Sequence, residues 1–139
     1  MDALKLENQL CFPLYACAKE VVKQYKPFLD EIGLTYTQYI AMMVLWEDKT
    51  TNVKTLGERL YLDSGTLTPL LKKLEAAGYV KRSRCAQDER NVTVALTPLG
   101  EELKCKAAEI PAKIGGCIHL SPEEAATLYR LLYKVLQQL

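Results

Sequence analysis

The fold is decided by the stretch VKTLGERLYLDSGTLTPLLKKLEAAG, residues 53–78. Its first part follows Asn52, which can cap a helix, and it carries apolar residues at helical spacing as far as Tyr61. A polar break at residues 62–65 separates it from a second apolar stripe, which runs from Leu67 to the helix-stopping Gly78. Two short helices joined by a tight polar turn are typical of a helix-turn-helix.

Two strand-like stretches come directly after these helices. Residues 79–84 and 91–96 alternate in polarity or are rich in β-branched side chains, and the polar residues 85–90 lie between them. The pattern predicts a β-hairpin. A hairpin that follows a helix-turn-helix is the layout of a winged helix.

Further helices are expected before this lobe. Apolar residues recur at helical spacing from Leu4 to Phe28, which predicts one long amphipathic helix ending at Pro27. Pro13 would interrupt that helix unless it lies in the first turn. A T-x-x-Q capping box at residues 35–38 predicts a second, buried helix over residues 39–46.

The C-terminal part is also expected to be helical. Thr97-Pro98 should begin a helix that runs to about Ile114, and an S-x-x-E box at residues 121–124 should begin the last one. The first and last helices are too apolar for a free monomer, so we expect a homodimer with two-fold symmetry. The alternative is that these stripes only cover the chain's own core.

The predicted fold class is therefore mainly α, a winged helix-turn-helix with a small β-hairpin wing and a helical dimerisation region from both chain ends. The whole chain, 1–139, forms a single domain. Residues 1–30 and 98–139 make the dimerisation region, and residues 35–97 make the DNA-binding lobe.

Length and composition narrow the function. The chain has 139 residues, 49% of them hydrophobic, which favours one globular domain. No apolar run is long enough to span a membrane and no secretion signal is present, so a cytoplasmic protein without membrane association is expected. The five cysteines form no C-x-x-C pair, and no hydrolase, nucleotide-binding or zinc-protease motif occurs. An enzyme, a metal site and a cofactor are not expected.

The small net charge of +1 conceals a local concentration of basic residues. Residues 64–84 contain five basic residues and one acidic residue, a local charge of +4, so the rest of the chain sums to −3. Basic side chains supply affinity for phosphates, and small polar groups at the start of a recognition helix reach base edges. The candidate DNA-binding residues are Asp63, Ser64, Thr66, Thr68, Lys72, Lys73, Arg82, Arg84, Asp88 and Arg90. In isolation, such a cluster would be an ordinary solvated charge run.

Several stretches resemble one family over essentially the whole chain. They are residues 6–12, 14–16, 23–27, 34–36, 38–39, 60–69 and 88–90. The chain resembles the MarR family of winged-helix regulators, and the cysteine and tyrosine segments narrow this to the organic-hydroperoxide-sensing OhrR branch. The resemblance implies a homodimer that binds double-stranded, inverted-repeat operator DNA and represses a peroxide-defence gene until its N-terminal cysteine is oxidised.

The resemblance also implies roles for individual residues. By motif position the sensing cysteine is Cys11, with Tyr25 and Tyr36 as its hydrogen-bonding partners and Tyr15 reaching in from the other subunit. A sensor thiol must be partly ionised to attack a peroxide, and phenolic donors stabilise a thiolate. Cys117 is the candidate for closing a disulfide to the sensor cysteine of the partner subunit. Without the tyrosines, Cys11 would be interpreted as a small buried hydrophobe on a helix stripe.

Two alternatives to this mechanism remain open. A repressor with the same fold could be released by a small phenolic or apolar ligand, without any change in thiol count. A thiol peroxidase would instead turn over at Cys11, although the P-x-x-x-T-x-x-C segment typical of such enzymes does not surround it.

Overall fold

The computed structural model describes residues 2–85 and 88–139, with side chains described outside residues 85–90. In chain order the elements are η1 (Leu6–Asn8), α1 (Cys11–Asp30), α2 (Tyr36–Asp48), β1 (Thr50–Asn52), α3 (Val53–Leu60), α4 (Ser64–Ala76), β2 (Val80–Cys85), β3 (Asp88–Leu96), α5 (Pro98–Ala107), α6 (Ile110–Gly115) and α7 (Pro122–Leu136). The chain is thus mainly helical with one small sheet. None of its described helices combines the length and the apolar character needed to cross a membrane.

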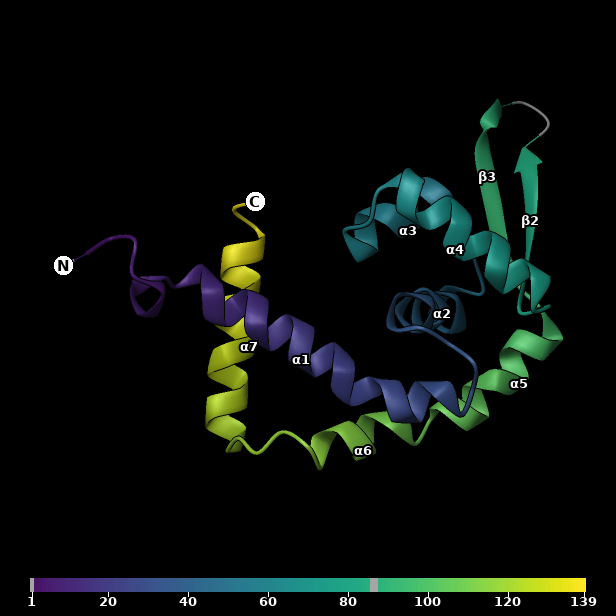
Figure 1. The fold of residues 1–139 in the computed structure, drawn as a ribbon. Coiled ribbons are helices and arrows are strands. Elements are labelled where there is room, and N and C mark those ends of the chain that lie inside the picture. Colours follow the sequence, from purple (N-terminus) through teal and green to yellow (C-terminus); the bar gives the residue numbers. More distant parts are fainter. Residues whose placement is uncertain (1, 86–87) are drawn as a thin grey trace.

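Helix α2 lies at the centre of the arrangement (Figure 1). Helices α1, α5 and α6 curve around one side of it, and α3 and α4 lie on the other side. The β2–β3 hairpin projects at one end of the molecule, and both chain ends lie at the opposite end. The core follows this layout, because Ala41, Met42 and Leu45 of α2 pack fully buried with Leu67 and Leu71 of α4.

The predicted helix-turn-helix is confirmed, and each of its ends has a local cause. The side chain of Asn52 accepts a hydrogen bond from the Thr55 amide at 2.7 Å and so begins α3. Tyr61 ends α3 in the left-handed conformation, with φ 57°. Asp63 then caps α4, which begins at Ser64 and so includes the second half of the polar break, residues 64 and 65.

The predicted hairpin is also confirmed, within a sheet of three strands rather than two. The strand order is β1-β3-β2 and both pairs are antiparallel, with Thr50 opposite Ala95 and Val80 opposite Leu96. Strand β1 was not predicted, because three residues are too few for any alternation to be visible. It ties the root of the wing to the segment that leads into α3.

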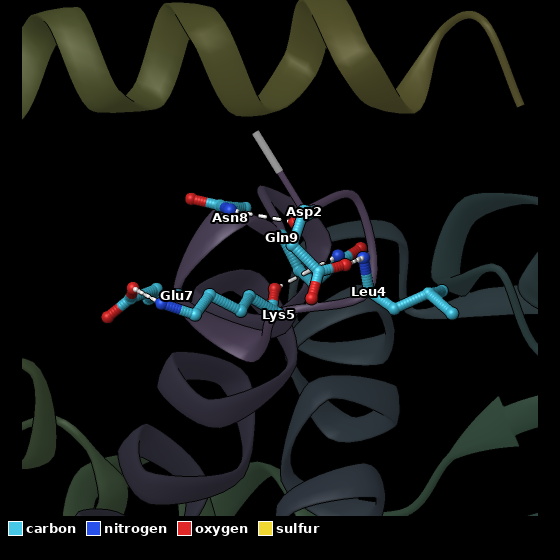
Figure 2. A network of polar contacts seen from close by, with 6 residues as sticks. All are labelled: Asp2, Leu4, Lys5, Glu7, Asn8 and Gln9. Atoms are coloured by element: carbon cyan, nitrogen blue, oxygen red, sulfur yellow. Dashed lines mark hydrogen bonds and ion pairs between the residues drawn. The ribbon is translucent and has the colours of Figure 1, made fainter.

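The N-terminal helix is shorter than predicted. Helix α1 begins at Cys11 rather than Leu4, so Pro13 lies in its first turn, where no amide donor is needed. The preceding residues fold on themselves, as Figure 2 shows: Asn8 Nδ2 donates to the Asp2 carbonyl at 2.8 Å, and Gln9 Nε2 donates to the Lys5 carbonyl at 3.1 Å. At its other end α1 continues through Pro27 to Asp30, so the predicted end at Pro27 was wrong.

The helix predicted over residues 98–114 is divided into α5 and α6. Pro111 is the reason, because it has no amide proton to donate to the carbonyl four residues earlier, that of Ala107, where α5 ends. The last helix agrees with its prediction, and Ser121 and Glu124 form the expected capping box. No residue of α7 is buried in the single chain.

Candidate functional site

The exposed face of α4 carries the small polar residues expected to meet DNA. Ser64, Thr68 and Lys72 follow one another at four-residue spacing, so they share one side of the helix, and all three are exposed. They line a groove whose other wall is formed by Arg82, Ser83 and Arg84 of β2 and Val92 of β3. The recognition helix and the wing thus form one continuous concave surface.

Asp63 has a structural role at the start of this surface, where it caps α4. Its Oδ1 accepts a hydrogen bond from the Thr66 amide at 2.7 Å. That bond lowers the pKa of the Asp63 carboxyl, so the group stays ionised at the positive end of the helix. The hydroxyl of Thr68 donates to the Ser64 carbonyl at 2.8 Å. The side chains of Ser64 and Thr66 are left on the exposed first turn.

The expected basic residues fall into two groups. Among side chains with described positions, Lys72 and Lys73 form no ion pair and extend from the exposed side of α4. Arg82, in contrast, is bound to Glu75 of α4: its Nη2 and Nε lie 3.1 and 3.2 Å from Glu75 Oε1. Asp88 and Arg90 belong to β3, but their side chains lie outside the described residues.

The candidate sensor thiol and two of its expected partners are far apart in one chain. Cys11 is the first residue of α1 and is exposed, and Tyr25 follows it by 14 residues on the same helix. At a rise of about 1.5 Å per residue, they are about 21 Å apart along the axis. Tyr15 lies one turn from Cys11 and is exposed. Within one chain, therefore, Tyr25 and Tyr36 are out of reach of Cys11, contrary to expectation, and Tyr15 is the tyrosine next to it on α1.

Tyr25 and Tyr36 instead belong to a tyrosine cluster completed by Tyr39. The ring centroids of Tyr25 and Tyr36 are 4.9 Å apart, and Tyr39 lies 5.9 Å from the first and 6.3 Å from the second. Burial raises the pKa of all three phenols, and the neighbouring rings raise those of Tyr25 and Tyr39 further. The phenols therefore stay protonated at neutral pH and can act as hydrogen-bond donors.

The tyrosine cluster is connected to the root of the wing through Trp46. The Tyr39 and Trp46 rings lie 6.4 Å apart, edge to face. The indole nitrogen of Trp46 donates to the Gly100 carbonyl at 2.9 Å. Sequence reasoning missed Trp46, which it assigned only to a buried helix. The capping box at residues 35–38 fixes where α2 begins but not which of its residues face α1, so no local signal singled out Trp46.

Cys117 lies just after α6, in the connection to α7. It is exposed, and its thiol donates weakly to the Lys113 carbonyl at 3.5 Å. Cys17 and Cys105 are exposed on α1 and α5, and the side chain of Cys85 lies outside the described residues. No disulfide is formed between the described cysteines, so the described thiols are all free in this single chain.

A large apolar surface remains exposed at the end of the molecule that carries both termini. On α7 the exposed apolar residues fall on one face at helical spacing, and Tyr129 and Tyr133 stack there with centroids 4.7 Å apart. The exposed apolar residues of α1 and α7 are Phe12, Tyr15, Val22, Leu128, Tyr129, Leu131, Leu132, Tyr133 and Val135. Exposed apolar patches of this kind are typical of sites where a protein contacts a partner or a ligand.

Known proteins resemble this chain in sequence and in fold. Residues 23–109 match the family described as the transcriptional regulator SarA/Rot. The chain is 51% identical over 138 residues to the organic hydroperoxide resistance transcriptional regulator of Bacillus subtilis, which covers 99% of this chain and 94% of that protein.

Two solved structures of AbfR from Staphylococcus epidermidis are similar at 34% identity. Reduced AbfR bound to DNA gives a TM-score of 0.80 over 96% of this chain and 92% of that chain. Disulfide-formed AbfR gives a TM-score of 0.67 over 94% of this chain and 92% of that chain. With the family match over most of its length and a relative 51% identical over nearly all of it, the chain belongs to the MarR family of winged-helix transcriptional regulators, in the branch of the organic hydroperoxide resistance regulators.

Proposed function

We propose that this protein is a dimeric, redox-regulated repressor that binds operator DNA when reduced and releases it when organic hydroperoxides oxidise Cys11. The observation that carries the proposal is the 51% identity, over 99% of the chain, to a regulator of organic hydroperoxide resistance. The greater likeness to reduced, DNA-bound AbfR than to its disulfide form supports a DNA-binding conformation for the chain described here.

The proposed dimer uses the exposed apolar faces of α1 and α7, so residues 1–30 and 98–139 form the dimerisation region and residues 35–97 the DNA-binding lobe. Support comes from α7, which buries no residue against its own chain although its apolar face is continuous. A two-fold arrangement presents two recognition helices to an inverted repeat, with half-sites about one helical turn apart.

In this dimer Cys11 of one protomer meets the tyrosine cluster of its partner. The separation of about 21 Å along α1 excludes the same contact within one chain. The raised pKa values of Tyr25 and Tyr36 keep both phenols protonated, which suits them to donate to a thiolate. The sensor is then complete only in the dimer, so that oxidation acts on the interface itself.

The chemistry needs only the thiol and the peroxide. The Cys11 thiolate attacks one peroxide oxygen: the S–O bond forms, the O–O bond breaks, and the alkoxide takes a proton to leave as an alcohol. The product is a sulfenic acid. The thiol of Cys117 from the partner subunit then attacks that sulfur, a disulfide forms and water leaves. The exposed position of Cys117 after α6 supports this second step.

The proposal is tested by operator binding and mass spectrometry on the same samples after graded cumene hydroperoxide. Cys11→Ser should stay bound to DNA at every dose, whereas Cys105→Ser, which removes another exposed thiol, should respond like the wild type. If Cys11→Ser still leaves its operator on peroxide treatment, the sensing assignment is wrong. Non-reducing electrophoresis should show a covalent dimer that is lost in Cys117→Ser, and persistence of that band would assign the second step to another thiol.

A second candidate is a repressor released by a small apolar or phenolic ligand. It is favoured by a largely apolar cavity between α1 and α2, lined by Val22, Leu29, Leu34 and Tyr36 with Lys23 and Lys26 at its edge. Such a ligand would release DNA from Cys11→Ser as readily as from the wild type, without loss of thiols. A thiol peroxidase is distinguished by turnover: with a reductant present, a sensor consumes about one peroxide per Cys11 and an enzyme consumes many.

A further inference from the structure

Among the described side chains, one residue pair, Glu75 and Arg82, joins the recognition helix to the wing by polar contacts. Glu75 lies in the last turn of α4 and Arg82 in β2, seven residues later. The Arg82 amide donates to Glu75 Oε2 at 2.9 Å, and its guanidinium donates twice to Oε1, at 3.2 Å from Nε and 3.1 Å from Nη2. Both carboxylate oxygens are therefore used. Because the Glu75 carboxylate is held by both the backbone amide and the guanidinium of Arg82, the contact fixes the orientation of β2 relative to α4 as well as the distance between them.

This contact is unusual for its location. Glu75 is the only acidic residue among residues 64–84, the most basic stretch of the chain, and it lines the groove between α4 and the wing. An acid near the phosphates of DNA opposes binding. The side chains of Arg82 and Glu75 are 24% and 37% exposed, and their average exposure is the lowest of any ion pair between described side chains. The pair is thus set into the groove wall rather than extended into solvent.

We propose that Glu75 and Arg82 are positioning residues for operator recognition: their contact sets the wing against the recognition helix, so that each protomer's two DNA-reading elements engage adjacent grooves together. The inference rests on the proposed DNA-binding function and reassigns Arg82, which the sequence suggested as a phosphate contact. The phosphate contacts then fall to neighbours such as Lys72 and Arg84, whose positions along the groove the pair fixes.

The two candidate roles of Arg82 predict opposite changes in DNA affinity for the substitution Glu75→Gln. If Arg82 binds a phosphate, then Glu75→Gln removes a competing negative charge and frees the guanidinium, so DNA binding becomes tighter. If Arg82 positions the wing, the same change breaks the bidentate contact, because an amide offers one acceptor oxygen in place of two. Binding to the specific site then weakens, while binding to unrelated DNA, which depends on charge alone, does not.

The experiment compares reduced wild-type protein, Glu75→Gln, Arg82→Gln and the double variant. The matched control is Glu102→Gln, which removes one exposed acid on α5. The probes are a duplex selected by the wild-type protein from a random-sequence pool and a scrambled duplex of the same composition. Hydrogen exchange of the β2 amides, measured without DNA, reports whether the wing is held, and urea unfolding confirms that each variant is folded.

Glu75→Gln should bind the selected duplex about tenfold more weakly, as expected for loss of one charge-assisted contact, and the scrambled duplex as well as or better than the wild type. The double variant should be no weaker than either single variant, and the β2 amides should exchange faster in all three. Tighter binding by Glu75→Gln, or unchanged exchange in β2, overturns the positioning role alone. A wild-type protein that selects no duplex overturns the DNA-binding function, and the positioning role with it.

Discussion

Gly100 offers a sharp test of how the wing is anchored. It is buried in the first turn of α5, where its amide donates to Thr97 Oγ1 at 3.1 Å and its carbonyl accepts from Trp46. A Cβ at this position would lie only 2.3 Å from the Tyr79 carbonyl oxygen and 2.7 Å from Cδ1 of Leu96. Because an ordinary carbon–oxygen contact is about 3.3 Å, Gly100→Ala must move backbone by about 1 Å.

The expected cost follows from these contacts. Overpacking against backbone costs about 1–3 kcal/mol, and a weakened Trp46 bond adds about 1 kcal/mol. The helix-forming preference of alanine returns about 0.5–1 kcal/mol. We therefore expect Gly100→Ala to lower the free energy of unfolding by about 2 kcal/mol. With a urea dependence of about 2 kcal/mol per molar, the unfolding midpoint falls by about 1 M.

The assay is urea unfolding followed by the fluorescence of Trp46, the single tryptophan of the chain, at fixed protein concentration. Gly115→Ala is the matched control, because the same change at the end of α6 meets nothing within 4 Å. It should leave stability unchanged or raise it by up to about 1 kcal/mol. If Gly100→Ala unfolds within about 0.5 kcal/mol of the wild type, the close approach of α5 to Tyr79 does not exist as described.

Three further predictions follow from local geometry. Tyr61→Gly should raise the free energy of unfolding by about 1 kcal/mol, since glycine adopts the left-handed backbone of this exposed residue without strain, and Tyr61→Ala should give no such gain. In an alkaline titration followed at the phenolate absorbance band, the tyrosine cluster should ionise above the usual tyrosine pKa of 10.0. The stability that the three protonated phenols contribute is present below that pH and is lost as the pH rises through their raised native pKa values. Asp63→Asn keeps the helix cap but removes the charge. Since the native pKa of Asp63 is lowered from 3.8, the wild type should be more stable than this variant above that pH. Acid unfolding curves should show that this advantage vanishes as the pH falls through the native pKa.

The parts of the fold that sequence predicted well are those specified by neighbouring residues. The capping boxes at residues 35–38 and 121–124 and the Asn52 cap depend on contacts three residues apart, and all three occur as expected. The wing was recognisable because both of its strands are long enough to show their pattern. Local signals of this kind need no knowledge of the rest of the chain.

The parts that sequence did not predict depend on tertiary context. Strand β1 exists only because β3 is present to pair with it. Pro27 lies inside α1, although proline normally ends a helix, and nothing in its neighbours announces this. In the candidate site, the pairing of Arg82 with Glu75 requires α4 and β2 to be brought together. A basic residue beside other basic residues was interpreted as a DNA contact, because charge along the sequence carries no information about partners across a turn.

The contact between Glu75 and Arg82 also changes what the local charge of +4 means. These two residues cancel, so the full charge of residues 64–84 belongs to Lys72, Lys73, Lys81 and Arg84. If each neutralises one phosphate, a dimer releases counterions from eight phosphates, and the logarithm of the binding constant falls with the logarithm of salt concentration with a slope of about −7 from this stretch. Arg82→Gln should leave that slope unchanged while weakening specific binding, whereas Lys72→Gln should reduce its magnitude by about two, one unit per protomer. If the magnitude of the slope falls equally in both variants, Arg82 contacts a phosphate and its positioning role is wrong.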